Sequence, residues 1–253
     1  MSISSEISRI KTNVANAYTA LSAKGATMPS ARNTANLKST IESIESVLAE
    51  AMSIETIRAI CVVLSDFEKN YTELEYIQSS GTQFVNTNLA VASGLDITFD
   101  FQCTTVASGT QFLFYGSDGW KNKGFGLYLS SSSAGAFCYG SEVGTGVSVA
   151  GAQRHTYKQN QNSLYIDGNL VKQLSAQTFS GSAPIILFAG SEGSSVGVSP
   201  VKGKLYSCQI RNNGTLVRDF VPCRRNSDNA IGLYDHVNEK FYGNAGSGSF
   251  TGA

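Results

Sequence analysis

The segment Leu95-Asp-Ile-Thr-Phe-Asp-Phe-Gln-Cys103 alternates apolar and polar side chains along its whole length. Because successive residues of a β-strand point to opposite faces of a sheet, this alternation predicts a strand with one buried face. Phe125, Leu127 and Leu129 repeat the same spacing, and we expect a second half-buried strand there. The pattern indicates a sheet that packs one face on a hydrophobic core.

Turn residues predict two hairpins in the same part of the chain. Asp167-Gly168 lies within Ser163–Val171, and Asn212-Asn213-Gly214 separates Lys204–Arg211 from Thr215–Val221. Pairs of this kind readily adopt the positive φ angles of type I′ turns. Further strands are expected at Glu75–Gln78, Gln83–Asn86, Gln111–Tyr115, Ala136–Tyr139, Arg154–Gln159, Ile185–Phe188, Ile231–Tyr234 and Lys240–Tyr242. About a dozen short strands joined by Gly/Ser-rich turns predict a mainly β, antiparallel sandwich over residues 71–253.

Before residue 70 the apolar spacing is helical instead. Core positions recur at alternating steps of three and four residues, which is the heptad pattern of a coiled coil. These positions are Ile3, Ile7, Ile10, Val14, Ala17 and Leu21, then Leu37, Ile41, Ile44 and Leu48. Because β-branched residues occupy both kinds of core position, a coiled coil of three helices is favoured over one of two helices. We therefore expect residues 1–70 to form a helical oligomerisation or attachment module of a homo-oligomer, a trimer in particular. The alternative is a helix that packs its stripe on its own β domain.

The composition narrows the classes of partner. The 253 residues include 19 Lys and Arg and 19 Asp and Glu, which gives a formal net charge of zero. A nucleic-acid binder needs surplus cations to neutralise phosphates, so we expect no nucleic-acid partner. The longest apolar run, Ala59–Leu64, is far shorter than the ~20 residues that span a bilayer, so no membrane insertion is expected. The five widely spaced cysteines and the lack of a secretion signal predict reduced, mostly buried thiols.

Both ends of the chain resemble bacteriophage tail proteins. Tyr71-Thr-Glu-Leu-Glu-Tyr-Ile-Gln-Ser-Ser-Gly-Thr-Gln-Phe-Val-Asn-Thr87 resembles the first strands of laminin-G/concanavalin A-like domains in tail fibre and baseplate proteins. Further segments that resemble this group are Leu216–Pro222, Gly232–Asp235, Lys240–Asn244 and, among the helical segments of tail proteins, Asn13–Leu21. The resemblance implies a jelly-roll head on a receptor-binding virion protein of the tail tip, made in the bacterial host cytoplasm. It also implies other tail proteins as partners of the N-terminal helices and a host surface glycan as the ligand.

No catalytic or metal-binding pattern stands out in the sequence. His155 and His236 lack a partner four residues away, so we expect no metal and no cofactor. Each is interpreted as a surface or edge-strand residue. Asp96 and Asp100 share a strand face about 13 Å apart, which exceeds the carboxylate separation of glycosidases. We expect a protein that is not an enzyme; glycan binding ranks first, a purely structural tail or capsid decoration component second, and a polysaccharide depolymerase third.

Candidate ligand-binding residues lie in two loops. The loop Gly116–Gly124 holds the single tryptophan of the chain, Trp120, with Asp118 and Asn122 beside it. An exposed indole covers the apolar face of a sugar ring, and short polar side chains bind its hydroxyls. Tyr139 begins the second loop. The alternative for Trp120 is an inward-facing side chain that anchors its own loop.

Overall fold

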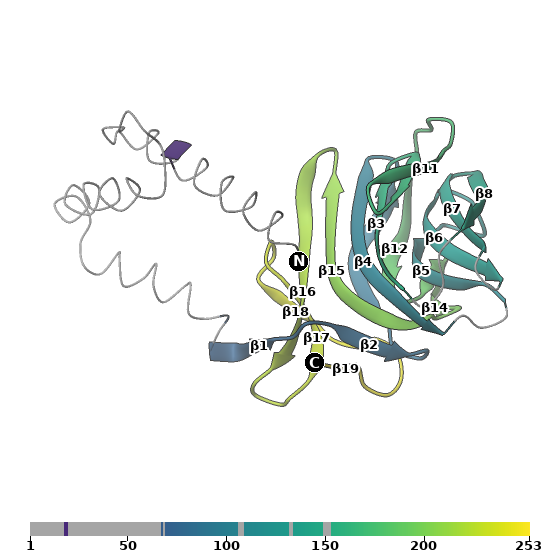
Figure 1. Cartoon of the computed structure of the whole chain (residues 1–253). Coiled ribbons are helices and arrows are strands. Elements are labelled where there is room, and N and C mark those ends of the chain that lie inside the picture. Colours follow the sequence, from purple (N-terminus) through teal and green to yellow (C-terminus); the bar gives the residue numbers. More distant parts are fainter. Residues whose placement is uncertain (1–17, 20–66, 68, 106–108, 132–133, 149–152) are drawn as a thin grey trace. The chain divides into compact units, whose positions relative to one another are not determined.

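The computed structural model describes residues 18–19, 67, 69–105, 109–131, 134–148 and 153–253 (Figure 1). The chain divides into two compact units, Met1–Phe67 and Glu68–Ala253. The expected heptad positions, from Ile3 to Leu48, lie outside the described residues. In the part of the chain that is described, the second unit contains nineteen strands, more than the dozen expected, because several pair over only two to four residues.

The larger sheet of the second unit has eleven strands among the described residues. They are β1 (Tyr71–Glu73), β2 (Ile77–Ser80), β4 (Leu95–Thr105), β9 (Arg154–Asn160), β10 (Ser163–Ile166), β11 (Asn169–Gln173), β15 (Lys202–Asn212), β16 (Thr215–Arg225), β17 (Ile231–Asp235), β18 (Lys240–Tyr242) and β19 (Thr251–Gly252). Their order is β11-β10-β9-β4-β15-β16-β17-β18, while β1 pairs with β16, and β2 pairs with β15 and β19. The sheet therefore combines strands from both ends of the unit.

The second sheet has six strands within the described residues. They are β3 (Val85–Ala92), β5 (Gln111–Gly116), β6 (Gly124–Ser131), β7 (Ala134–Gly140), β8 (Glu142–Ser148) and β12 (Ser180–Leu187), in the order β3-β12-β5-β6-β7-β8. A short hairpin of β13 (Gly190–Glu192) and β14 (Ser195–Val198) stands apart. Neighbours such as β4 with β15 are antiparallel and far apart in the sequence, so the chain crosses repeatedly between the sheets. Figure 1 shows the sheets as separate layers, with β4 and β15 in one and β5 and β6 in the other.

The main core fills the space between the two sheets. Residues of β4 alternate between buried and half-buried positions over the predicted segment, which confirms the period-two interpretation. Phe99 of β4 meets Phe114 of β5 edge-on, with ring centroids 5.3 Å apart. Burial of such large aromatic side chains is the main stabilising contribution to a sandwich of this kind.

The six-stranded sheet is buried on both faces at β5, β6 and β7, and this corrects the expectation for 125–129. Phe125, Leu127 and Leu129 face the main core as expected. Tyr128, however, is also buried, because it joins a second apolar cluster on the opposite face of the sheet. This outer cluster consists of Phe112, Tyr115, Tyr128, Ala136 and Cys138. β6 is therefore not a half-buried strand.

Both predicted hairpin turns are confirmed by their backbone angles. Asp167 and Gly168 have φ angles of 51° and 82°, and they join β10 to β11. Asn213 and Gly214 have φ angles of 49° and 80°, and they join β15 to β16. Positive φ at two successive residues is the requirement of a type I′ turn, which matches the right-handed twist of the strands it joins.

The described cysteines are buried thiols, as expected from the sequence. Cys103, Cys138, Cys208 and Cys223 are free and inaccessible to solvent, while Cys61 lies outside the described residues. Burial raises the pKa of the Cys103, Cys138 and Cys223 thiols to about 12. Among the described residues, no helix has the length and apolar character needed to cross a bilayer.

Candidate functional site

The loop between β5 and β6 holds Trp120 at the protein surface. Its side chain is 50% exposed. The indole centroid lies 5.9 Å from that of Tyr128 and 6.4 Å from those of Phe112 and Tyr115. One part of the ring therefore rests on the outer cluster, and the rest is open to solvent. The Nζ atom of Lys121 lies 5.0 Å from the ring centroid, so a cation accompanies the exposed indole.

Backbone hydrogen bonds fix the shape of this loop. The Asp118 amide donates to the Asn122 carbonyl over 3.0 Å, and the Asn122 amide donates back to the Gly119 carbonyl over 2.7 Å. Lys121 and Lys123 adopt left-handed backbone angles, with φ of 61° and 51°. A turn closed in this way holds the backbone at Trp120 in one conformation before any ligand arrives. Binding then costs little conformational entropy.

Asp118 fastens the loop to the neighbouring strand β12. Its Oδ1 atom accepts hydrogen bonds from the amides of Ser182 and Ala183, over 2.7 and 3.1 Å. Its Oδ2 atom lies 3.3 Å from Nζ of Lys123. The hydrogen bond from the Ser182 amide is the main reason that the pKa of Asp118 is lowered. Asp118 thus positions the loop, whereas the side chain of Asn122 is exposed next to Trp120.

Tyr139, the other predicted ligand-binding residue, lies in the main core. Its side chain is 2% exposed, and its ring packs edge-on against Phe179 with centroids 5.2 Å apart. Its hydroxyl lies within hydrogen-bond distance of two carbonyls, 2.9 Å from that of Ser93 and 3.1 Å from that of Gln177. The structure therefore separates Tyr139 from Trp120, which lies over the opposite face of the six-stranded sheet, and leaves no ring face for a ligand.

A polar groove on the outer face of the eleven-stranded sheet was not anticipated from the sequence. It has a volume of about 340 Å³. Its lining comes from β4, β9, β10 and the turn after β10, and it consists of Thr98, Thr156, Lys158, Asn160, Tyr165 and Gly168. Outward positions with a period of two could have marked these side chains as surface residues. The alternation of polar and apolar residues does not show that β4, β9 and β10 are neighbours in the sheet.

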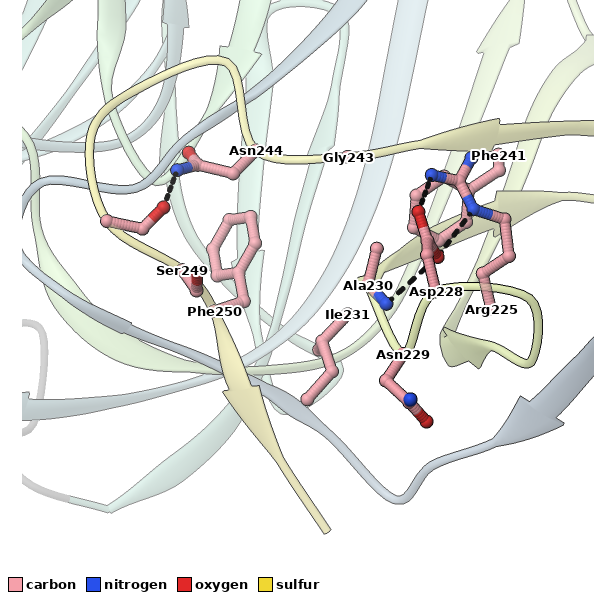
Figure 2. A pocket seen from close by; sticks show the side chains of 11 residues that line it. Arg225, Asp228, Asn229, Ala230, Ile231, Phe241, Gly243, Asn244, Ser249 and Phe250 are labelled. Carbon is pink, nitrogen blue, oxygen red and sulfur yellow. Dashed lines mark hydrogen bonds and ion pairs between the residues drawn. The ribbon is translucent and has the colours of Figure 1, made fainter.

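A second pocket of about 460 Å³ lies between the β16–β17 turn and the glycine- and serine-rich C-terminal segment. Figure 2 shows Arg225 and Asp228 facing each other at one end of it. Two hydrogen bonds of 2.9 and 2.6 Å join them. These hydrogen bonds from Arg225 are the main reason that the pKa of Asp228 is lowered to about 2. Asn244 donates to the Gly248 carbonyl over 2.9 Å. Arg225 and Asp228 thus stabilise the turn, and Asn244 stabilises the C-terminal segment through its backbone.

The acids and the histidine of β4 and β9 are engaged in structural contacts. Asp100 accepts two hydrogen bonds from Arg154, over 2.9 and 2.7 Å. Burial raises the pKa of Asp96. His155 was expected at the surface or on an edge strand, but its side chain is only 11% exposed, and β9 is paired on both sides. Its Nδ1 atom lies 2.6 Å from Oδ2 of Asp167, which ties the β10–β11 turn to β9.

Known proteins show only distant similarity to this chain. No family model matches the chain, and no curated protein matches it. Among solved structures, CBM40 of Ruminococcus gnavus IT-sialidase bound to alpha2,3 sialyllactose is similar, with a TM-score of 0.42 and 15% identity over 55% of this chain and 89% of that chain. The same CBM40 without a named ligand has a TM-score of 0.41 at 15% identity, over 55% of this chain and 90% of that chain. The structure bound to alpha2,6 sialyllactose has a TM-score of 0.42 at 14% identity over the same shares.

Proposed function

We propose that residues 71–253 form a carbohydrate-binding β-sandwich that holds a glycan against Trp120. The observation that carries this proposal is the half-exposed indole on its base of buried aromatic rings. An exposed indole at the surface gains free energy when it covers the apolar face of a sugar ring. The amide of Asn122 and the ammonium of Lys121, next to the same ring, offer hydrogen-bond partners for the hydroxyls of that sugar.

The rigidity of the loop supports binding as its role. Asp118 fixes the loop to β12, so Trp120 need not be ordered when a ligand binds. A preformed platform of this kind avoids the entropic cost of ordering the loop on binding. The proposal therefore assigns Trp120 and Asn122 to direct contact with the glycan and Asp118 to positioning.

The wider proposal is a virion protein of a phage tail tip, with the sandwich as a laminin-G/concanavalin A-like jelly-roll head. Its support is the resemblance of both ends of the chain to tail fibre and baseplate proteins. In this proposal residues 1–70 form a homo-oligomer, a trimer, and attach it to other tail proteins. The head binds a host surface glycan without catalysis. The absence of catalysis in this proposal is supported by Asp100, whose carboxylate forms an ion pair with Arg154.

The contact of Trp120 with the outer cluster favours a second candidate function. A tryptophan that covers Phe112 and Tyr128 also stabilises its own loop, as it would in a purely structural tail or capsid component with no ligand. The two functions predict different behaviour towards sugars. In the structural alternative, changing Trp120 affects stability alone.

A glycan array of bacterial surface polysaccharides tests the proposal with the full chain. We expect binding by the unmodified protein, loss of signal for Trp120→Ala and substantial retention for Trp120→Phe, which keeps an aromatic face. Val237→Ala is the matched control, because Val237 is another exposed apolar residue, 41% accessible, in the β17–β18 turn. Absence of any glycan signal, or equal signals for Trp120→Ala and the control, would refute glycan binding at Trp120. Assay of reducing-sugar release on the same polysaccharides tests the depolymerase alternative.

A further inference from the structure

The groove on the eleven-stranded sheet is built by register across three strands. Tyr165 of β10 pairs with Lys158 of β9, and Lys158 pairs with Thr98 of β4. Thr156 and Asn160 flank Lys158 two residues away along β9. Paired strands lie about 4.8 Å apart and alternate residues about 6.8 Å apart, so the other four residues lie around Lys158 on a patch about 10 Å across the strands and about 14 Å along β9, which is large enough for a sugar unit.

The polar side chains of this groove are free to bind a ligand. Within the described residues, the side chains of Thr98, Thr156, Lys158, Asn160 and Tyr165 form no hydrogen bond or ion pair. Lys158 has a purely electrostatic interaction with Asp96, a β4 residue outside the lining of the groove. The groove therefore offers an ammonium group, two aliphatic hydroxyls, an amide and a phenol together.

The part of the same sheet face around Arg154 differs from the groove, because its polar groups bind one another. Arg154 forms two hydrogen bonds to Asp100 and lies 3.7 Å from the ring centroid of Tyr206. The Tyr206 hydroxyl donates to Oε1 of Gln102 over 3.0 Å. These side chains are therefore engaged with one another, unlike those of the groove.

The hairpin end of the groove is held in place by Asp167. Its Oδ1 atom accepts a hydrogen bond from the Thr156 amide over 3.0 Å, and its Oδ2 atom lies 2.6 Å from Nδ1 of His155. The adjacent Gly168 has a φ of 82°, as the turn requires. The groove wall between β9 and the turn is therefore fixed before binding, which lowers the entropic cost of binding.

We propose that this groove is a second glycan site and that it takes a sugar unit carrying a carboxylate. Lys158 is the one charged residue in the groove lining among the described residues, so the site favours an anionic group. Tyr165 offers a ring face and a hydroxyl, and the threonines and Asn160 pair with sugar hydroxyls.

The proposal goes beyond glycan binding at Trp120, because the two sites lie on different sheets. Trp120 lies over the outer face of the six-stranded sheet, and the groove lies on the outer face of the eleven-stranded sheet. The main core separates the two faces. One head would then hold a host polysaccharide at two points, and the two contacts would reinforce each other through effective concentration.

Calorimetric titration of the full chain with glucuronate and galacturonate tests the proposal, with glucose and galactose as neutral counterparts. We expect the uronates to bind more tightly than the neutral sugars. Lys158→Gln should weaken uronate binding about tenfold or more, since it removes a charge-assisted contact, and should leave neutral sugars unaffected. Tyr165→Ala should weaken both. Lys172→Gln is the matched control, because it removes the same charge from an exposed position on β11.

Trp120→Ala separates this proposal from the previous one. Uronate binding that survives Trp120→Ala and fails with Lys158→Gln supports the groove. Uronate binding that fails with Trp120→Ala and survives Lys158→Gln overturns the groove and leaves glycan binding at Trp120 intact. Equal affinity for uronates and neutral sugars, or no uronate binding at all, also overturns it, whatever the glycan array shows for Trp120.

Discussion

Tyr71 stacks on Phe241, with ring centroids 5.8 Å apart and ring planes 16° from parallel. Tyr71 belongs to β1, the first strand of the sandwich, and Phe241 belongs to β18, near its end. The guanidinium carbon of Arg225 lies 4.6 Å from the centroid of the same phenyl ring, and the backbone of Arg225 pairs with that of Tyr71. Tyr234 of β17 also contacts Tyr71. The first strand of the sandwich therefore packs against the C-terminal strands β16, β17 and β18.

Replacing Tyr71 should loosen this attachment. We expect Tyr71→Ala to lower the free energy of unfolding by about 1–2 kcal/mol, because it removes two aromatic contacts and part of their buried area. Tyr71→Phe keeps the stacked ring and should lower stability much less. Chemical denaturation of both variants measures the difference. Equal stability of Tyr71→Ala and the unmodified protein would show that the stack contributes nothing.

Fluorescence of Trp120 reports directly on the proposed platform. Because its side chain is 50% exposed, we expect acrylamide to quench the emission of the free protein. A bound polysaccharide should shift the emission to the blue and protect it from the quencher. Trp120→Ala should weaken binding by about 0.5–1.5 kcal/mol beyond the lost area, which is the scale of a stacking contact. Emission that acrylamide cannot quench in the free protein would contradict an exposed indole.

Removing the Asp118 carboxylate should release the Trp120 loop from β12. We expect Asp118→Ala to lower the free energy of unfolding at pH 7 by about 1–3 kcal/mol, because two amides lose their acceptor. It should also weaken glycan binding. Since the folded-state pKa of Asp118 is lowered, its stabilisation is complete above its usual pKa of 3.8 and is lost as pH falls through the lower, folded value. Denaturation at pH 7 and near pH 2 checks this: a difference between protein and variant that stays constant with pH would contradict it.

The buried thiols should react only after unfolding. In a Cys61→Ser background, we expect a thiol reagent to modify Cys103, Cys138, Cys208 and Cys223 only in denaturant, because burial raises their pKa and blocks access. A reducing agent should leave the melting temperature unchanged. Rapid reaction of the native protein, or a marked fall in melting temperature on reduction, would speak against buried free thiols.

The heptad pattern makes a prediction about assembly. Deleting residues 1–67 should leave a folded β head that is monomeric in light scattering, whereas we expect the full chain to be a homo-oligomer. Lys69 and Asn70 remain in this variant because both of their carbonyls accept hydrogen bonds from Asn226. A head that keeps the stoichiometry of the full chain would show that the sandwich, and not the N-terminal segment, drives assembly.

The sequence alone determined the local structure of the sandwich. Alternation along 95–103 predicted β4, and the pairs Asp167-Gly168 and Asn213-Gly214 predicted two turns that have the expected φ angles. These features succeed because strand period and turn chemistry depend on residues adjacent in the chain. The heptads of residues 1–70 stay a prediction.

Only the tertiary structure decided which side chains meet. The sequence marks Trp120 as the single tryptophan in a polar loop, but its aromatic base comes from Phe112 and Tyr128 on two neighbouring strands. Tyr139, chosen for the same chemistry, points into the main core, because the face that a strand residue occupies depends on how its sheet packs. The groove beside Lys158 cannot be predicted from local patterns for the related reason that Thr98 lies far from Lys158 in the sequence. Strand order and register bring such residues together, and both are set by the burial of apolar side chains across the whole sandwich rather than by any local pattern.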